Sequence, residues 1–434
     1  MLSRMKKILL LTLLCIAGCG LKAQQTANRP TLVAGIPVNY SEDSTGTYSL
    51  PDLLKCADGQ AVTNAKIWTQ KRRPELLKLV EEIQFGKMPG KPSNLKFNVF
   101  DKGTPAFSGK ALRKQVTVYF TADTADHKMN LVIYLPAAAK KPSPMLLNIS
   151  FAAYNQIIDD PGLLVGTIWN REGQRVKADK PSVFGNMDIE QFMDAGIGFA
   201  TVYYGDIEPD FKDGINHGIR KVYLKRGQTE TAPDEWGAIA AWSWGLSRAM
   251  DYFETDKQID AKRVALQGAS RLGKTVLWAG IRDPRFKMVI ASISGEGGAA
   301  LARRNYGETI GHITDPSRYL YQFAPNYHTY ADKVNTMPFD AHALVALMAP
   351  RPLLLQTGST DYWSDPKGEF LAAQAAAPVY KLFNKTAPPA GNMPAAGDTS
   401  LLMNDLGYFM HEGGHTVLPE DWKLMIAYMQ RFLL

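Results

Sequence analysis

The sequence predicts one large three-layer α/β domain with a mostly parallel central sheet and antiparallel strands on its N-terminal side. Two observations carry this prediction. Alternating apolar and polar residues come first, at 95–100, 114–120 and 129–135, and each run is typical of a half-buried antiparallel strand. From residue 145 onward, apolar strands alternate with helices, and this order builds a parallel sheet covered on both faces.

The individual elements follow from periodicity and from start and stop signals. A helix is expected at 74–85, because Leu76, Leu77, Val80 and Ile83 have helical spacing and Gly86 can end it. The expected later strands are 145–151, 197–204, 263–267, 286–293, 352–356 and 407–410, and the expected later helices are 235–253, 272–281, 370–383 and 421–433. Two long irregular stretches, 152–188 and 205–231, should lie at the ends of core strands, where long loops are usually functional.

The N-terminus has the pattern of an export signal. Basic residues precede an apolar run at 8–17, which is too short to span a membrane, and Ala23 precedes a suitable cleavage site. A competing interpretation is a lipobox at 16–19, which would leave a lipid anchor on Cys19. We therefore expect an exported protein, periplasmic or extracellular, with a signal peptide at 1–23, an arm at 24–61 and a catalytic domain at 62–434.

Composition limits the classes of partner. The chain has 434 residues, 45% of them hydrophobic, and a formal charge of +7, which is too mild for a nucleic-acid surface and would suit an acidic polysaccharide. Two of the three cysteines lie in the signal, so Cys56 has no partner for a disulfide. No zinc-type cluster of ligands is visible, so we expect neither a metal nor another cofactor. We expect a monomer.

Ser270 is the candidate nucleophile. It lies in Gly268-Ala-Ser-Arg-Leu-Gly-Lys274, between an expected strand and an expected helix. This is the context of a nucleophile elbow, a tight turn that lifts a serine out of the sheet edge. The second glycine of the usual G-x-S-x-G pattern is Gly273, one place late, so an ordinary N-cap serine is the alternative.

A base and an acid follow Ser270 in the chain order that the α/β-hydrolase fold requires. Asp361 follows the strand at 352–356, and His415 follows two glycines after the last strand. His411 lies in the same late region and is expected to be structural, while Asp365 is the rival of Asp361. Nucleophile, base and orienting acid in this order predict acyl transfer.

Several motifs around these residues resemble those of the glucuronoyl esterases, carbohydrate esterase family 15, of the bacterial type. The likeness extends from about residue 68 to the end and is carried by segments 268–274, 294–299, 303–304, 307–309, 361–366 and 413–415. It implies a serine esterase that cleaves esters of (4-O-methyl-)glucuronic acid in glucuronoxylan, including its ester links to lignin alcohols.

The resemblance also implies roles for four residues near the serine. Arg271 would stabilise the oxyanion, while Lys274, Glu308 and Trp363 would bind the sugar. Without the resemblance, Arg271 and Lys274 could form helix-surface salt bridges and Trp363 could simply be packed.

The sequence departs from fungal members of the family at two positions. Ala269 replaces a cysteine, and Ile293 stands where those members carry their acid, so Asp361 must serve here, with Glu296 as a weaker candidate. Two other functions stay open. One is an acetyl-xylan or other carbohydrate esterase with the same triad, and the other is a non-catalytic polysaccharide-binding protein on this fold.

Overall fold

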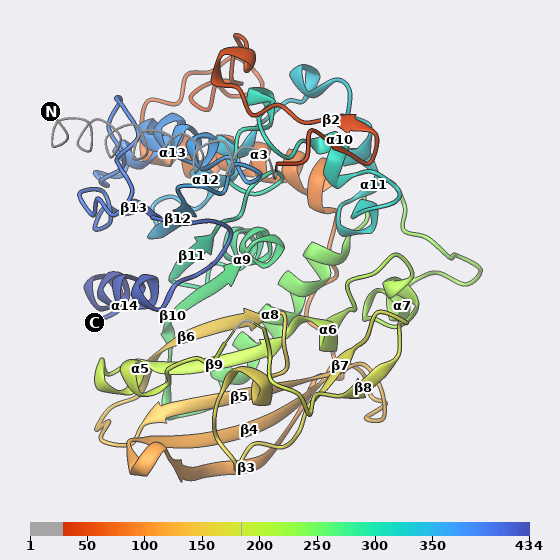
Figure 1. Cartoon of the computed structure of the whole chain (residues 1–434), viewed down its shortest axis with the longest axis vertical. Coiled ribbons are helices and arrows are strands. Elements are labelled where there is room, and N and C mark those ends of the chain that lie inside the picture. Colours follow the sequence, from red (N-terminus) through yellow and green to blue (C-terminus); the bar gives the residue numbers. More distant parts are fainter. Residues whose placement is uncertain (1–28, 184) are drawn as a thin grey trace, which may run out of the picture.

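The computed structural model describes residues 29–183 and 185–434 (Figure 1). The expected signal peptide at 1–23, the lipid anchor at Cys19 and the first residues of the arm lie outside the described residues. Within the described part of the chain, no helix has the length and apolar character needed to cross a membrane.

The strands of the described residues form one nine-stranded sheet and two short hairpins. Along the sheet the order is β13-β12-β11-β10-β6-β9-β5-β4-β3. The six strands from β13 to β9 are parallel, whereas β5, β4 and β3 each run antiparallel to the strand before them. The predicted mixed sheet, parallel apart from its N-terminal strands, is confirmed.

The strands are β1 (Leu32–Val33), β2 (Ile36–Pro37), β3 (Lys96–Ala106), β4 (Ala111–Tyr119), β5 (Lys128–Pro136), β6 (Ser143–Ser150), β7 (Thr167–Trp169), β8 (Arg175–Lys177), β9 (Gly198–Tyr203), β10 (Ile259–Ala269), β11 (Met288–Ser292), β12 (Leu353–Gly358) and β13 (Leu406–His411). The α-helices are α2 (Ala65–Ile67), α3 (Arg73–Val80), α4 (Tyr154–Ile157), α5 (Glu190–Asp194), α6 (Tyr204–Ile207), α7 (Arg220–Tyr223), α8 (Ala238–Phe253), α9 (Arg271–Arg282), α10 (Ile310–Ile313), α11 (Pro325–His328), α12 (Ala341–Leu347), α13 (Pro366–Lys381) and α14 (Pro419–Leu433).

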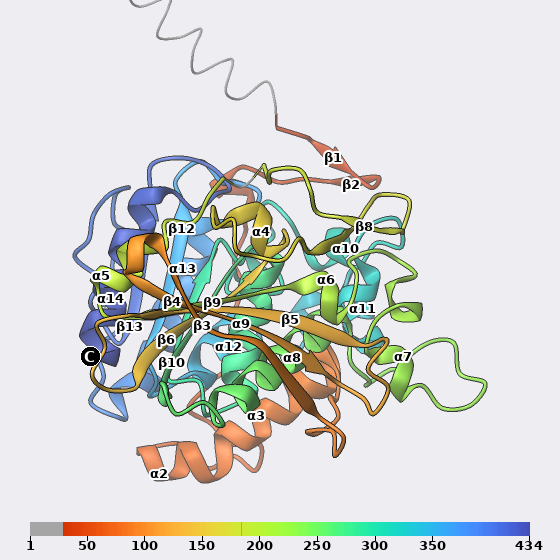
Figure 2. The ribbon, with the colours of Figure 1, turned by 90° about the horizontal axis from the view of Figure 1, so that it is seen from below.

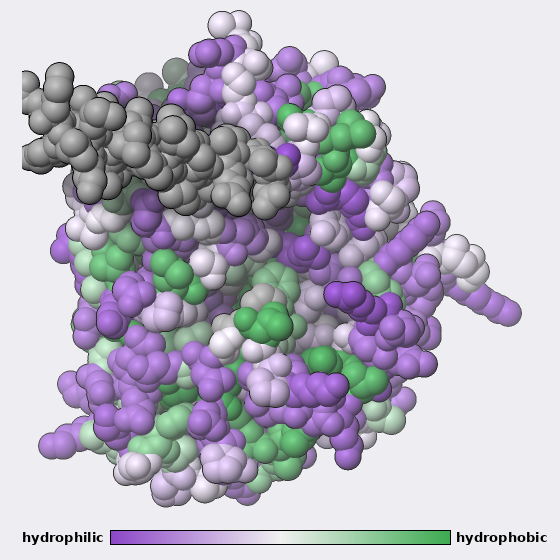
Figure 3. Space-filling view, viewed as in Figure 1, coloured by the Kyte–Doolittle hydropathy of each residue, from purple (hydrophilic) through white to green (hydrophobic). Residues whose placement is uncertain are grey.

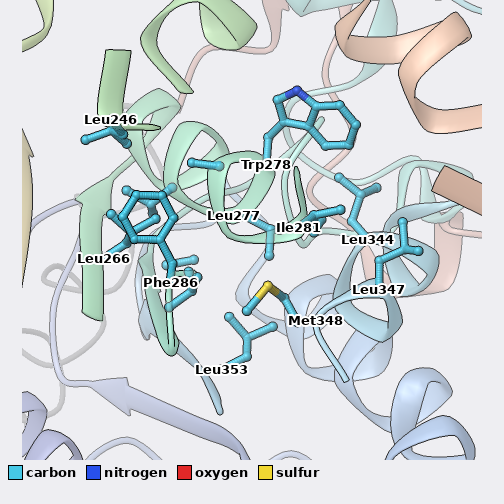
Figure 4. Packing of buried hydrophobic residues seen from close by; sticks show 14 of the residues in the cluster. Leu246, Leu266, Leu277, Trp278, Ile281, Phe286, Leu344, Leu347, Met348 and Leu353 are labelled. Carbon is cyan, nitrogen blue, oxygen red and sulfur yellow. The ribbon is translucent and has the colours of Figure 1, made fainter. Parts of the chain in front are cut away.

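Helices cover both faces of the sheet, which makes the three layers (Figures 1 and 2). One core contains residues of α8, α9, α12 and α13, and the other contains residues of α5 and α14. Helix α9 is central to the first core: Figure 4 shows Leu277, Trp278 and Ile281 among side chains from α8, α12 and the sheet. On the face in Figure 3, apolar residues form small patches within a mostly hydrophilic surface, as is usual when the large apolar area is internal.

Strands β4 and β5 are buried on both faces, so the expectation of half-buried strands is wrong for them. The loop between β6 and β9 lies over the face that was expected to meet solvent. Its Asp160 accepts hydrogen bonds from Arg113 Nη1 of β4 at 2.9 Å and from Tyr134 Oη of β5 at 2.8 Å. Polar groups on that face therefore have partners although water is excluded.

The first helical segment begins nine residues before the expected start at Pro74. Helical turns run from Ala65 to Phe85, and Gly86, with φ of +84°, ends them as predicted. The start signal is Asn64, whose side chain accepts the amide of Ile67. A π-helical turn, Trp68–Arg72, interrupts the regular hydrogen-bond ladder just before Pro74, a residue that has no N–H to donate.

Helix α12 and the β7–β8 hairpin were not predicted. All seven residues of α12 are buried, so the helix has no polar face and its sequence has no amphipathic period. The hairpin lies within the irregular stretch at 152–188, which is therefore not entirely without secondary structure.

The described part of the arm, residues 29–61, packs against the body although it contains little regular structure. Asn39 O accepts the amide of Gly307 at 2.8 Å, and Glu42 pairs with Lys367 at 2.5 Å and with Arg304. The arm thus contacts the loop before α10 and the start of α13, both at the edge of the sheet where parallel strands end.

Candidate active site

Ser270 lies in a strained turn between β10 and α9. Its φ and ψ are +58° and −128°, in a region that residues other than glycine rarely adopt. A Cβ on Gly268 would lie 2.4 Å from Leu272 O, and a Cβ on Gly273 would lie 2.7 Å from Ser292 O. Both positions therefore require glycine because of close backbone contacts. Gly273 meets this requirement although it lies one residue after the second glycine of the usual G-x-S-x-G pattern.

Asp361 and His415 meet at the carboxyl end of the sheet. Asp361 follows β12, His415 lies between β13 and α14, and Asp361 Oδ2 is 2.7 Å from His415 Nδ1. Ser364 Oγ is 3.1 Å from the same nitrogen. The carboxylate is buried, whereas the histidine side chain is 44% exposed. An imidazole held at Nδ1 by a carboxylate presents Nε2 as a base.

The order of the strands explains why these loops converge. Strands β10, β11, β12 and β13 are parallel neighbours, so the loops after them share one edge of the sheet. No hydrogen bond joins Ser270 to His415 among the described residues. Catalytic hydrogen bonds are often long or poorly aligned in the absence of substrate.

The loop that carries His415 is fixed by its own contacts. Thr360 donates its amide to Gly413 O at 2.8 Å, and Ser359 Oγ accepts the amide of Gly413. His411 lies 2.8 Å from Asp421 through Nδ1 and 3.1 Å from Gly414 O through Nε2. His411 therefore supports the loop, in agreement with its expected structural role.

Neither rival acid contacts His415. Asp365 pairs with Arg304 at 2.9 Å and accepts the amide of Gly368. Glu296 is buried and accepts a hydrogen bond from Tyr327. Burial, with the nearby carboxylates of Asp340 and Glu308, raises the pKa of Glu296 well above its usual range.

Arg271 begins α9 and is held from outside that helix. Its Nη1 donates to Asp210 Oδ2 at 2.6 Å, and its guanidinium carbon is 4.4 Å from the centre of the Tyr319 ring. Burial alone would lower the pKa of Arg271, but Asp210 outweighs it and the pKa is raised. Asp210 also accepts from Tyr321 and Gln322, at 2.8 and 2.7 Å. The long loop at 205–231 thus reaches the nucleophile elbow through one carboxylate.

Lys274, Glu308 and Trp363 are also brought to this side of the sheet. Glu308 donates its amide to Trp363 O at 2.8 Å, and its carboxylate accepts from Arg318 at 2.9 Å. Burial raises the pKa of Glu308 and lowers that of Lys274, while each charge opposes the shift of the other. Within the described residues the Lys274 ammonium makes no hydrogen bond, so it can donate to a ligand.

Sequence reasoning missed Asp210, Arg318 and the arm residues that lie beside His415. Arg29 and Tyr40 line a pocket of about 340 Å³ together with His415. These residues lie in loops without a motif or periodic pattern, and only the folded chain brings them to the site. The described residues contain no group of three or more His, Cys, Asp or Glu side chains that could hold a metal ion.

Comparisons with known proteins agree with this geometry. A family model described as fungal glucuronyl esterase matches residues 177–384. The carbohydrate esterase MZ0003 of an unknown prokaryotic organism is 42% identical over 90% of this chain and 91% of its own length. The glucuronoyl esterase of Solibacter usitatus, whose structure is solved, is 43% identical, with a TM-score of 0.84 over 90% of this chain and 99% of that one.

A more distant relative is the 4-O-methyl-glucuronoyl methylesterase of Podospora anserina, 27% identical over 72% of this chain and 56% of its own length. The identity and coverage of MZ0003 and of the Solibacter usitatus esterase are high enough to establish the family. The chain therefore belongs to the glucuronoyl esterases of carbohydrate esterase family 15 and is a carboxylic ester hydrolase with the α/β-hydrolase fold.

Proposed function

We propose that this enzyme hydrolyses esters of (4-O-methyl-)glucuronic acid in glucuronoxylan, including the ester links between xylan and lignin alcohols. The observation that carries the proposal is the Asp361–His415 contact at the edge of the sheet where the strained turn of Ser270 also lies, in a chain 43% identical to a glucuronoyl esterase. Hydrolysis of methyl glucuronate by the purified protein, compared with acetylated xylan, tests it. A protein that releases acetate but leaves the uronate ester intact would be the rival carbohydrate esterase.

The proposed mechanism is acyl transfer through Ser270. His415 Nε2 takes the hydroxyl proton while Ser270 Oγ attacks the ester carbonyl, and Asp361 holds the imidazole in the required tautomer. His415 then protonates the leaving alcohol, and water releases the uronate by the same steps. The free first-turn amides of α9 and the remaining donors of Arg271 stabilise the oxyanion.

Lys274, Glu308 and Trp363 are proposed to hold the sugar. The buried ammonium of Lys274 can donate to hydroxyl oxygens, and Glu308 can accept from hydroxyl groups. We also propose that the protein is exported, with the signal at 1–23 and either cleavage after Ala23 or lipidation at Cys19, and that it acts as a monomer.

Replacing Lys274 or Glu308 by alanine should lower kcat/KM for methyl glucuronate. The expected loss of transition-state stabilisation is about 1–3 kcal/mol for each lost pairing. The weak activity on p-nitrophenyl acetate should hardly change, because that ester lacks the sugar hydroxyls. Steady-state kinetics on both esters checks this, with the exposed Lys262→Ala as a matched control. If both activities fall together, the two residues support the triad and do not bind the sugar.

Asp210→Asn should lower kcat on methyl glucuronate by about ten- to hundredfold, the loss expected for a charged hydrogen bond. The amide has the same shape as the carboxylate but lacks its charge, so its hydrogen bond to Arg271 is weaker. The guanidinium group would then be less well oriented toward the oxyanion. Asp213→Asn changes an exposed carboxylate of the same loop and should have no effect. Unchanged kcat in Asp210→Asn would mean that Arg271 needs no partner.

A further inference from the structure

A pocket of about 340 Å³ lies between the N-terminal arm and the loop after β12. The arm contributes Arg29, Pro30 and Tyr40, and the body contributes Tyr362, Trp363 and His415. Its volume is within the range of sites for small ligands. One wall of a pocket beside the proposed catalytic base is thus made by a segment outside the catalytic sheet.

The arm wall is anchored by specific contacts to the loop that carries Glu308. Asn39 O accepts the amide of Gly307, and Asn39 Nδ2 donates to Asn305 O at 2.9 Å. Ile36 O is 3.4 Å from His312 Nε2, and both ribbon views place β2 next to α10 (Figures 1 and 2). The loop that holds the arm also holds the body side of the pocket, because Glu308 donates its amide to Trp363 O. The two walls of the pocket are therefore fixed relative to each other.

The lining combines aromatic faces with hydrogen-bond donors. The Arg29 guanidinium carbon lies 3.4 Å from the centre of the Tyr362 ring and 5.7 Å from that of Tyr40. Arg29 forms no ion pair within the described residues, so its N–H groups remain available to hydroxyl oxygens. Aromatic faces edged by donors and a phenol suit a ring that carries hydroxyl groups, because stacking and hydrogen bonds are satisfied together.

The pocket adjoins the proposed uronate site but is distinct from it. Lys274 and Glu308 are not part of its lining, whereas Trp363 is. Tyr40 lies close enough to Glu308 for their charges to interact: burial raises the pKa of Tyr40, Arg29 opposes the rise, and Glu308 adds to it. A sugar bound by Lys274, Glu308 and Trp363 would therefore lie next to this pocket, with Trp363 shared between the two.

We propose that this pocket is a subsite for the neutral sugar to which the uronic acid is attached, and that Arg29 and Tyr40 select uronate esters on a glycan chain. The inference rests on the proposed function, because it assigns the uronate ring to Lys274, Glu308 and Trp363. The occupant is a neutral pyranose of the polysaccharide. Because His415, which protonates the leaving alcohol, is also part of the lining, the test includes an ester with a bulky leaving alcohol.

The test compares Arg29→Ala and Tyr40→Ala with the parent enzyme on three esters. They are methyl glucuronate, the methyl ester of glucuronate linked to a xylo-oligosaccharide, and benzyl glucuronate. For the oligosaccharide ester, kcat/KM should fall about tenfold in each variant, the loss of one hydrogen bond or stacking contact. The other two esters should stay within about twofold. Leu32→Ala, on the same arm and 60% exposed, should behave as the parent on all three.

The other outcomes overturn the subsite. An equal fall on all three esters means that the arm supports the catalytic residues or the uronate ring itself, and a fall confined to benzyl glucuronate assigns the pocket to the leaving alcohol. No change on any ester means that the pocket binds no part of the substrate. Failure of the proposed function gives a different result, because the parent enzyme would then not hydrolyse methyl glucuronate at all.

Discussion

Ser270→Ala should abolish the hydrolysis of methyl glucuronate and leave the fold and the binding of glucuronate in place. The substitution removes the attacking oxygen and little else, because alanine keeps the Cβ that already occupies the strained turn. Hydrolysis followed by release of methanol, together with calorimetric titration of glucuronate, measures both properties. Ser364→Ala, which removes the hydroxyl that lies 3.1 Å from His415 Nδ1, should retain much more activity. Turnover near the parent rate in Ser270→Ala would exclude this serine as the nucleophile.

Asp361→Asn should lower kcat by about 10⁴-fold, because an amide favours the wrong tautomer of the base and cannot stabilise the imidazolium. Steady-state and single-turnover rates on methyl glucuronate measure this loss, and thermal unfolding shows whether the fold is intact.

Glu296→Gln is the matched control for Asp361→Asn. Glu296 makes no contact with His415 among the described residues, and burial raises its pKa, so replacing its carboxyl group by an amide should change activity little. If Glu296→Gln is the crippling change and Asp361→Asn is mild, the orienting acid is Glu296 and its contact with Tyr327 must rearrange in the complex with substrate.

The fold could be predicted from the sequence because most core strands and helices have strong periodic patterns. Strands β9, β11 and β13 and helix α9 begin and end within one or two residues of their expected bounds. The failures have a common cause. Helix α12 has no polar face, and β4 and β5 are covered on their second face by a distant loop, so local patterns could not reveal either feature.

The site was predictable to the extent that its residues stand in loops directly after core strands. Asp361 and His415 were expected to be partners on chain order, and their side chains are 2.7 Å apart. Asp210, Arg318 and Arg29 could not be inferred, because nothing local distinguishes these charged residues from the other charged residues of their loops. Their importance arises from the tertiary structure, which brings the loop at 205–231, the region before α11 and the arm to one edge of the sheet.

The backbone conformation of Ser270 has a consequence for heat tolerance. A positive φ at a residue with a Cβ costs about 1–3 kcal/mol, which is a sizeable part of the net stability of a folded domain. Glycine would relieve this cost but would also remove the hydroxyl. Selection or engineering for thermotolerance therefore meets a trade-off at this position: the residue that gives the enzyme its proposed reactivity also lowers its melting temperature, and stabilisation must come from elsewhere in the fold.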